Sequence, residues 1–115
     1  MSRWRPTPGQ KAADRRTNTL VYVAPSRIHG KGLFARRSLE KGLHVGTYLG
    51  PAAQRNGSHV LWVEDGDGWT GRRGFNRLRY LNHSGEPNAE FDGFDLYVIR
   101  PIAPHEEITI DYHWD

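Results

Sequence analysis

The sequence predicts a single, mainly β domain with little helix, on three observations. Its 115 residues suffice for one hydrophobic core but not for two. Its apolar runs are only about five residues long and partly β-branched, which is typical of strands. Glycine and proline, with 13 and 7 copies, interrupt these runs with turns. The pattern favours small sheets joined by tight turns over a helical bundle.

Taken in order, the apolar runs predict six short strands. These are residues 20–24, 44–50, 59–63, a return strand beginning at 69, 95–99 and 107–111. The sequence Asp65-Gly66-Asp67-Gly68 predicts a hairpin turn between the third and fourth strands. The only expected helix is brief and covers residues 72–81. Residues 1–19 are polar, basic and without periodicity, so we expect a flexible N-terminal arm before a domain spanning 20–115.

Composition excludes several kinds of site. There are no cysteines, so disulfides, thiolate zinc sites and thiol nucleophiles are excluded. The six histidines are scattered without an i, i+4 pair, so no metal site is expected. Ser84 directly follows His83, which does not suit a nucleophile–base pair, and no nucleophile elbow is found. No apolar run is long enough for a membrane span, and no signal peptide is recognised, so we expect a soluble cytoplasmic protein.

Charge is distributed unevenly along the chain. The net charge is +3, yet from Tyr80 onward eight acidic residues accompany one basic residue, Arg100. Such a segment would repel the phosphates of nucleic acid and attract a cationic partner. A direct nucleic-acid partner is therefore not expected. Solvation of two turns by the same carboxylates is the plainer alternative.

Residues 79–88, Arg-Tyr-Leu-Asn-His-Ser-Gly-Glu-Pro-Asn, are unusually rich in short hydrogen-bonding side chains. Asn and Ser bond the backbone locally and hold irregular paths, and Pro87 ends any helix that enters the segment. A capped helix followed by a loop would explain this stretch taken alone. Its neighbours along the chain favour another interpretation.

Four stretches in this order resemble the SET-domain protein-lysine methyltransferases. They are Ile28-His29-Gly30-Lys31-Gly32-Leu33-Phe34-Ala35, then Tyr48-Leu49-Gly50, then Arg79-Tyr80-Leu81-Asn82-His83-Ser84 with Pro87-Asn88, and finally residues 106–112, Glu-Glu-Ile-Thr-Ile-Asp-Tyr. The resemblance covers residues 21–112 and implies β-clip-like small curved sheets with a C-terminal pseudoknot crossing. It also implies that residues 103–112 pass beneath the 79–88 loop, where side-chain hydrogen bonds replace a regular ladder.

The resemblance further implies transfer of methyl groups from S-adenosylmethionine to lysine side chains of a basic protein, histone-like or ribosomal. The implied cofactor-binding residues are Lys31, Gly32, Leu33, Arg79, Asn82 and His83. Trp114, an aromatic residue near the end of the last strand, is expected to cover the adenine.

Tyr112 and Tyr48 are the expected catalytic residues. The hydroxyl of Tyr112 is expected at the methyl-transfer point, and Tyr48 in the wall of the lysine channel, although core packing would also explain Tyr48. Phe91 and Ile110 are expected to line the same channel. Neither carries a hydroxyl that would anchor a water, so we expect more than one methyl addition.

The chain also departs from the family pattern. A cysteine-rich zinc module is absent, the segment between Leu49 and Arg79 is short, and Thr47 stands where an acidic residue is common. Closure of the site would then come from Trp114, the basic arm or a second subunit, and the last of these would make the protein a homodimer. A catalytically silent SET-fold binding module is the alternative function.

Overall fold

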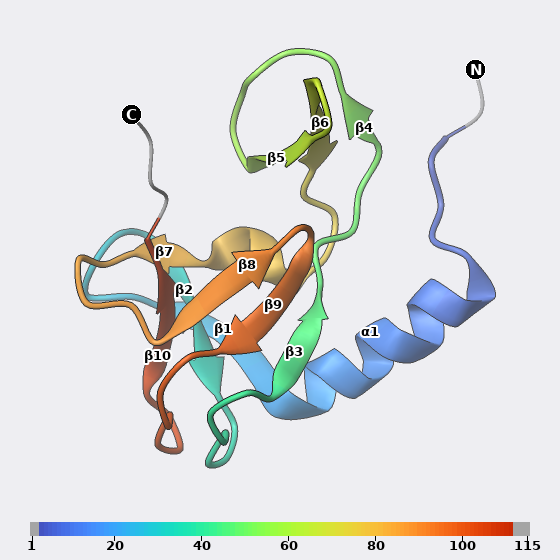
Figure 1. Ribbon diagram of the computed structural model, residues 1–115. Coiled ribbons are helices and arrows are strands. Elements are labelled where there is room, and N and C mark those ends of the chain that lie inside the picture. Colours follow the sequence, from blue (N-terminus) through green and yellow to red (C-terminus); the bar gives the residue numbers. More distant parts are fainter. Residues whose placement is uncertain (1–2, 112–115) are drawn as a thin grey trace.

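The computed structural model describes residues 3–111, which form three small sheets, one α-helix and one 3-10 helix (Figure 1). The first sheet has the order β1 (Val21–Pro25), β2 (Lys31–Ala35), β10 (Glu107–Ile110) and β7 (Asn82–His83). The second contains β3 (His44–Thr47), β9 (Asp95–Val98) and β8 (Ala89–Asp92). The third contains β4 (Ala52–Ala53), β6 (Gly68–Arg73) and β5 (Val60–Asp65). The prediction of a mainly β fold is confirmed.

The last strand lies inside the first sheet rather than at its edge. β10 pairs antiparallel with β2, Ile108 facing Leu33, and parallel with β7, Thr109 facing Asn82. The side chain of Asn88, only 1% exposed, bonds β10 twice: its Nδ2 donates to the Glu107 carbonyl (2.8 Å) and its Oδ1 accepts from the Thr109 amide (2.9 Å). The C-terminal crossing implied by the resemblance is therefore present, and a side chain takes the place of a ladder partner.

A helix, α1 (Pro8–Leu20), occupies most of the segment that the sequence suggested was an arm without regular structure. That prediction is wrong for these residues. Thr7 and Gln10 form a capping box, and Pro8 begins the helix, so the start signal was readable. Apolar periodicity was weak because the helix buries only Thr17 and Leu20. The Thr17 hydroxyl donates to the Val45 carbonyl at 2.9 Å, which fixes α1 against β3.

The prediction of a helix over residues 72–81 is also wrong in its extent. Only η1 (Arg77–Tyr80) is helical, and it is a 3-10 turn. The backbone amide of Arg73 donates to the Pro51 carbonyl at 2.9 Å, and that of Phe75 donates to the Leu49 carbonyl at 2.8 Å. These bonds keep the residues before η1 extended. Tertiary pairing thus replaces the local helical bonds that the sequence suggested.

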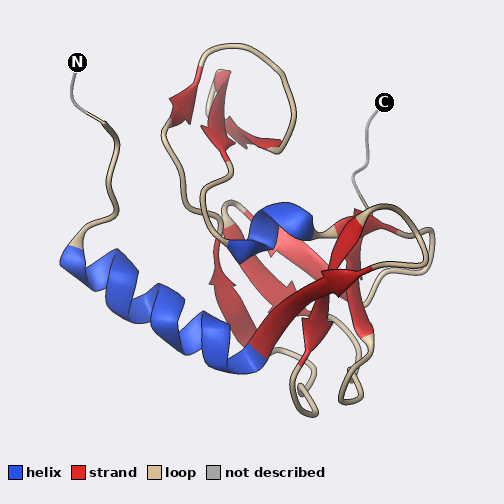
Figure 2. Ribbon diagram, turned by 180° about the vertical axis from the view of Figure 1, so that it is seen from behind, coloured by secondary structure: helices blue, strands red, loops and turns tan. Residues whose placement is uncertain are grey.

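The predicted hairpin is confirmed: β5 and β6 are antiparallel and meet at Gly66, whose φ of +60° suits glycine. Figures 1 and 2 show the sheet of β4, β5 and β6 set apart from the other two, joined to them by extended segments. The main core lies between the first two sheets and η1, and contains the fully buried residues Leu33, Val45, Leu78, Leu96, Ile102 and Ile108.

Candidate functional site

A cavity of about 300 Å³, here called the loop cavity, lies between the 29–31 loop and η1. Three of the residues expected to bind the cofactor line it: Lys31, Arg79 and Asn82. His29, Gly30, His59, Tyr80 and Leu81 complete the wall. The fold therefore brings together segments that lie about 50 residues apart in the sequence, as between Lys31 and Asn82.

Asn82 ties together the segments that form this cavity. Its Nδ2 donates towards the His29 carbonyl (3.0 Å), the Lys31 carbonyl (3.2 Å) and Oε2 of Glu107 (2.9 Å). Two amide hydrogens thus serve three acceptors inside the protein. A donor group of a ligand would accordingly be received by the other atom of the amide, Oδ1.

Glu107 is a positioning residue that the sequence did not reveal. Both of its carboxylate oxygens accept from the Ser26 hydroxyl, at 2.8 and 2.9 Å, in addition to the bond from Asn82. Gly32 packs so closely that an added Cβ would lie 2.9 Å from the Glu107 carboxyl carbon. A side chain at this position would therefore displace the carboxylate from its bonds to Ser26 and Asn82. The bond between Ser26 and Glu107 spans 81 positions, so no local sequence pattern could have indicated it.

Cations and an aromatic ring lie together in the wall of the loop cavity. Nη1 of Arg79 donates to the Phe75 carbonyl, and Nη2 donates to the Tyr80 hydroxyl at 2.8 Å. The same guanidinium lies 4.6 Å from the centre of the Tyr80 ring, and Nζ of Lys31 lies 6.0 Å from it. This wall presents positive charge beside flat aromatic surface.

A second space of about 290 Å³, the channel cavity, adjoins the loop cavity. The two have His59, Arg79 and Leu81 in common. Tyr48, Phe91 and Ile110, the residues expected in a lysine channel, all line it. Tyr48 is also packed in the core, edge to face with Phe91 at 5.8 Å, and its hydroxyl donates to the His59 carbonyl. Tyr48 is therefore part of the core and also part of the channel wall.

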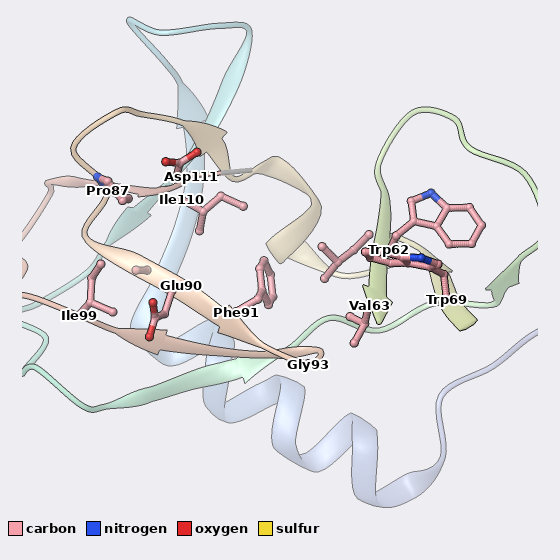
Figure 3. A pocket seen from close by; sticks show the side chains of 12 residues that line it. Trp62, Val63, Trp69, Pro87, Glu90, Phe91, Gly93, Ile99, Ile110 and Asp111 are labelled. Atoms are coloured by element: carbon pink, nitrogen blue, oxygen red, sulfur yellow. The ribbon is translucent and has the colours of Figure 1, made fainter. Parts of the chain in front are cut away.

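The third space, the groove, has a volume of about 470 Å³ and shares Leu61, Phe91 and Ile110 with the channel cavity. Figure 3 shows the hairpin side chains Trp62 and Trp69 on one side of it and Ile110 with Asp111 on the other. Trp69 is 65% exposed. The carboxylates of Glu90 and Asp111 also line the groove, so it combines aromatic surface with negative charge.

The remaining expected site residues are placed differently. Gly32 and Leu33 lie within β2 and do not line the loop cavity, and Leu33 is fully buried with strand partners on both sides. The backbone of His83 pairs with Ile110, and its ring Nδ1 lies 3.6 Å from a carboxylate oxygen of Asp111. Tyr112 and Trp114 lie outside the described residues, so their expected roles stay predictions.

The carboxyl group of Asp95 has a lowered pKa. The Thr47 hydroxyl donates to Asp95 at 2.6 Å, and this bond lowers the pKa of that carboxyl, aided by the hydrogen bond and charge of His44 and by the charge of Arg72. Burial opposes the shift. The side chains of Thr47 and Asp95 thus join β3 to β9 at the position where the sequence departs from the family pattern.

Within residues 3–111, no group of three or more His, Asp or Glu side chains is arranged to hold a metal ion. Over the same part of the chain, no helix combines the length and apolar character needed to cross a bilayer.

The SET-domain family model matches residues 30–113, which is most of the chain and includes Tyr112 and every lining residue of the loop and channel cavities except His29. This chain belongs to the SET-domain family. Trp114 and α1 lie outside the matched region of the SET domain.

Two similar proteins illustrate the family. Human histone-lysine N-methyltransferase 2D is 34% identical over 117 residues, covering 83% of this chain and 2% of that protein. Histone-lysine N-methyltransferase MEDEA of Arabidopsis thaliana is 28% identical over 117 residues, covering 84% of this chain and 17% of that protein. The chain thus spans a small fraction of the length of these relatives.

Solved structures share the SET fold. The methyltransferase domain of human histone-lysine N-methyltransferase SETMAR superposes with a TM-score of 0.70 at 23% identity, over 80% of this chain and 44% of that one. The methyltransferase domain of human PR domain-containing protein 2 gives 0.71 at 21% identity, over 100% of this chain and 92% of that one.

Proposed function

We propose that this SET domain transfers methyl groups from S-adenosylmethionine to a lysine side chain of a basic protein. The observation that carries the proposal is the series of three adjoining cavities. The loop cavity meets the channel cavity at His59, Arg79 and Leu81, and the channel cavity meets the groove at Leu61, Phe91 and Ile110. A lysine side chain of a peptide in the groove would reach through the channel towards a cofactor in the loop cavity.

The chemistry of the loop cavity fits S-adenosylmethionine. Lys31 and Arg79 offer positive charge to a carboxylate, and Oδ1 of Asn82 offers an acceptor to an ammonium group. The rings of Tyr80 and His59 offer flat surface to a purine. An added Cβ on Gly30 would meet nothing within 4 Å, so a ligand can approach this backbone closely.

The groove suits an extended peptide because a sheet-edge strand lines each side of it. β5 ends the order β4-β6-β5, and β8 ends the order β3-β9-β8, and residues of both strands line the groove. An edge strand offers unpaired backbone groups to an added strand, and alternate side chains then set specificity. The carboxylates of Glu90 and Asp111 would favour basic residues beside the target lysine. The names of the relatives make histone-like substrates the first to test.

The channel would prepare the lysine for reaction. The bound cofactor supplies an electrophilic methyl group on a sulfonium centre. Free lysine is mostly protonated at neutral pH. The apolar side chains of Leu78, Leu81, Phe91 and Ile110 in the channel wall, together with the positive charge of Arg79, disfavour that charged form. The same wall holds the amine in line with the methyl group, and such orientation supplies much of the rate of a displacement. The aromatic faces of Tyr48 and Phe91 would hold a methylated ammonium by cation–π attraction.

Tyr112 remains our choice for the residue at the methyl-transfer point. β10 ends at Ile110, which lies in the wall common to channel and groove, so the chain arrives at Tyr112 two residues beyond that wall. A phenol can donate to or accept from an amine without being charged at neutral pH.

The test is incubation with labelled S-adenosylmethionine and a panel of histone and ribosomal proteins, with wild-type protein, Tyr112→Phe and Trp69→Ala. We expect label transfer by wild type, a loss of about 100-fold in Tyr112→Phe, within the range usual for proton-handling side chains, and weaker peptide binding in Trp69→Ala. Mass spectrometry of the product is expected to show more than one methyl group. Cofactor binding without transfer to any substrate would favour a silent binding module, and absence of cofactor binding would refute both functions.

A further inference from the structure

His59 lies where the loop cavity and the channel cavity meet, and it lines both of them. Its φ of +61° places it in the left-handed region, which is uncommon for a residue other than glycine. Such conformations persist where surrounding contacts over-determine them, and they cluster at functional sites.

The contacts of His59 account for the conformation. Its carbonyl accepts from the Tyr48 hydroxyl and from the Gly74 amide, the latter at 2.8 Å. Its ring Nδ1 lies 2.9 Å from the Arg79 carbonyl, and the ring packs edgewise on Tyr80 at 5.9 Å. The residue therefore connects the channel wall to η1.

The hydrogen bond to Arg79 assigns the tautomer of the neutral ring. A carbonyl oxygen only accepts, so Nδ1 of His59 must donate and carries the proton. The lone pair of the neutral ring is then on Nε2. Protonation at Nε2 would keep the bond to Arg79 and add a positive charge to the wall between the two cavities.

The surroundings do not compensate that charge. The titratable groups that share the loop cavity with His59 are His29, Lys31, Arg79 and Tyr80, and those of the channel cavity are Tyr48 and Arg79. No carboxylate lines either cavity among the residues that the structure describes. The carboxylate of Glu107 lies behind the loop, bonded to Ser26 and Asn82.

We propose that His59 discriminates between the cationic methyl donor and the neutral thioether product, because a positive charge on its ring weakens binding of the sulfonium and not of the thioether. This inference rests on the proposed function. Where the two cavities meet is where the reacting methyl group would lie, so the sulfonium and the His59 ring would be close neighbours. Two like charges about 4 Å apart in bulk water weaken binding by about three- to tenfold, and an uncharged thioether escapes this effect. His59 is exposed, so the bulk-water value applies to its ring.

The experiment compares dissociation constants of S-adenosylmethionine and S-adenosylhomocysteine by isothermal titration calorimetry at about pH 8 and about pH 5.5, which bracket histidine protonation. The measured quantity is the ratio of the two constants, because effects of pH that are common to both ligands cancel. For the wild type we expect the ratio to shift about three- to tenfold against the donor at the lower pH. In His59→Asn we expect no shift.

His105 supplies a matched control. It too has a left-handed backbone, with φ +65°, its ring Nδ1 bonds the Tyr22 hydroxyl at 3.0 Å, and it packs edgewise on Tyr22 at 5.8 Å. It lines none of the three cavities. Asparagine tolerates the left-handed region, so His59→Asn and His105→Asn carry the same backbone change. His59→Gly, which adopts that conformation freely, repeats the test if the asparagine variant folds poorly.

A pH-dependent ratio in wild type and His105→Asn that disappears in both His59 variants supports the proposal. A ratio that does not change with pH in the wild type overturns it, and so does a change that persists without His59. In both of these cases cofactor binding, and with it the proposed function, would stand. Failure of the wild type to bind either ligand at about pH 8 would instead refute the proposed function and this inference with it.

Discussion

The side chain of Asn88 is the most direct test of what holds the C-terminal crossing together. It is 1% exposed and bonds the β10 backbone on both sides, donating to the Glu107 carbonyl and accepting from the Thr109 amide. Its own carbonyl accepts from the amide of Ile99 at 2.9 Å. Asn88→Ala removes the two side-chain bonds and leaves this main-chain bond in place.

The expected loss of stability follows from the two backbone groups that would lose their partner, the Glu107 carbonyl and the Thr109 amide. Each buried backbone group without a partner costs about 1–3 kcal/mol, so the variant should lose roughly 2–5 kcal/mol of unfolding free energy. A domain of this size has roughly 5–15 kcal/mol in total, so the loss is a large share. Asn88→Asp keeps the acceptor for the Thr109 amide but directs a carboxylate oxygen at the Glu107 carbonyl. Its loss at neutral pH should be at least as large.

The assay is urea denaturation followed by far-UV circular dichroism. A lower midpoint with an unchanged slope is expected, because the change is in stability and not in the surface exposed on unfolding. Asn56→Ala is the control: its side chain accepts from Nε1 of Trp62 at the surface, at 3.2 Å, and its removal should cost less than about 1 kcal/mol. Asn88→Asp should also recover relative to wild type as the pH falls, because a carboxyl group opposite a carbonyl is more stable protonated and can then donate.

A loss below about 1 kcal/mol in Asn88→Ala would refute this reasoning, since water or a shifted backbone would then satisfy both groups. Equal losses in Asn88→Ala and Asn56→Ala would do the same. In either case the crossing would be maintained by the strand pairing of β10 with β2 and β7, without a contribution from the loop.

Two further predictions concern the loop cavity and acid stability. Gly32→Ala should destabilise the fold by about 1–3 kcal/mol and weaken cofactor binding, because its Cβ would crowd the Glu107 carboxyl carbon at 2.9 Å; Gly57→Ala, with nothing within 4 Å, should have little effect in the same melts. Thr47→Val removes the bond that lowers the pKa of Asp95, so that pKa should rise towards its ordinary 3.8. Because the folded-state pKa is the lower one, the stabilisation exists above about pH 4 and is lost as the pH falls through the folded value. The deficit of Thr47→Val in urea melts should therefore be smaller at about pH 3 than at about pH 6, and an equal deficit at both would contradict the assignment.

Much of the candidate site could be predicted from the sequence, because the motifs that carry the family resemblance include the site residues themselves. Lys31, Arg79 and Asn82 were expected together and do line one cavity, and Phe91 with Ile110 lines the next. The function of the Asn82 amide was less accessible. Its nitrogen serves the 29–31 loop and β10, which depends on which segments come to lie side by side.

His59 and Glu107 show why the rest could not be predicted. A left-handed histidine has no sequence signature, because the conformation is imposed by partners such as the Tyr48 hydroxyl and the Gly74 amide. The bond between Glu107 and Ser26 joins the two ends of the domain. Helix α1 is a different case, since its capping box was present in the sequence while its apolar face was too small to reveal it.

The sequence by itself determined the mainly β class, the hairpin at Gly66 and the family, because strand length, turn residues and motif order are local or sequential properties. Only the tertiary structure decided the insertion of β10 between β2 and β7, the extended path before η1, and the junction of two cavities at His59. The physical reason is that buried backbone groups must find partners, and which distant segment supplies them is settled only when the chain is packed.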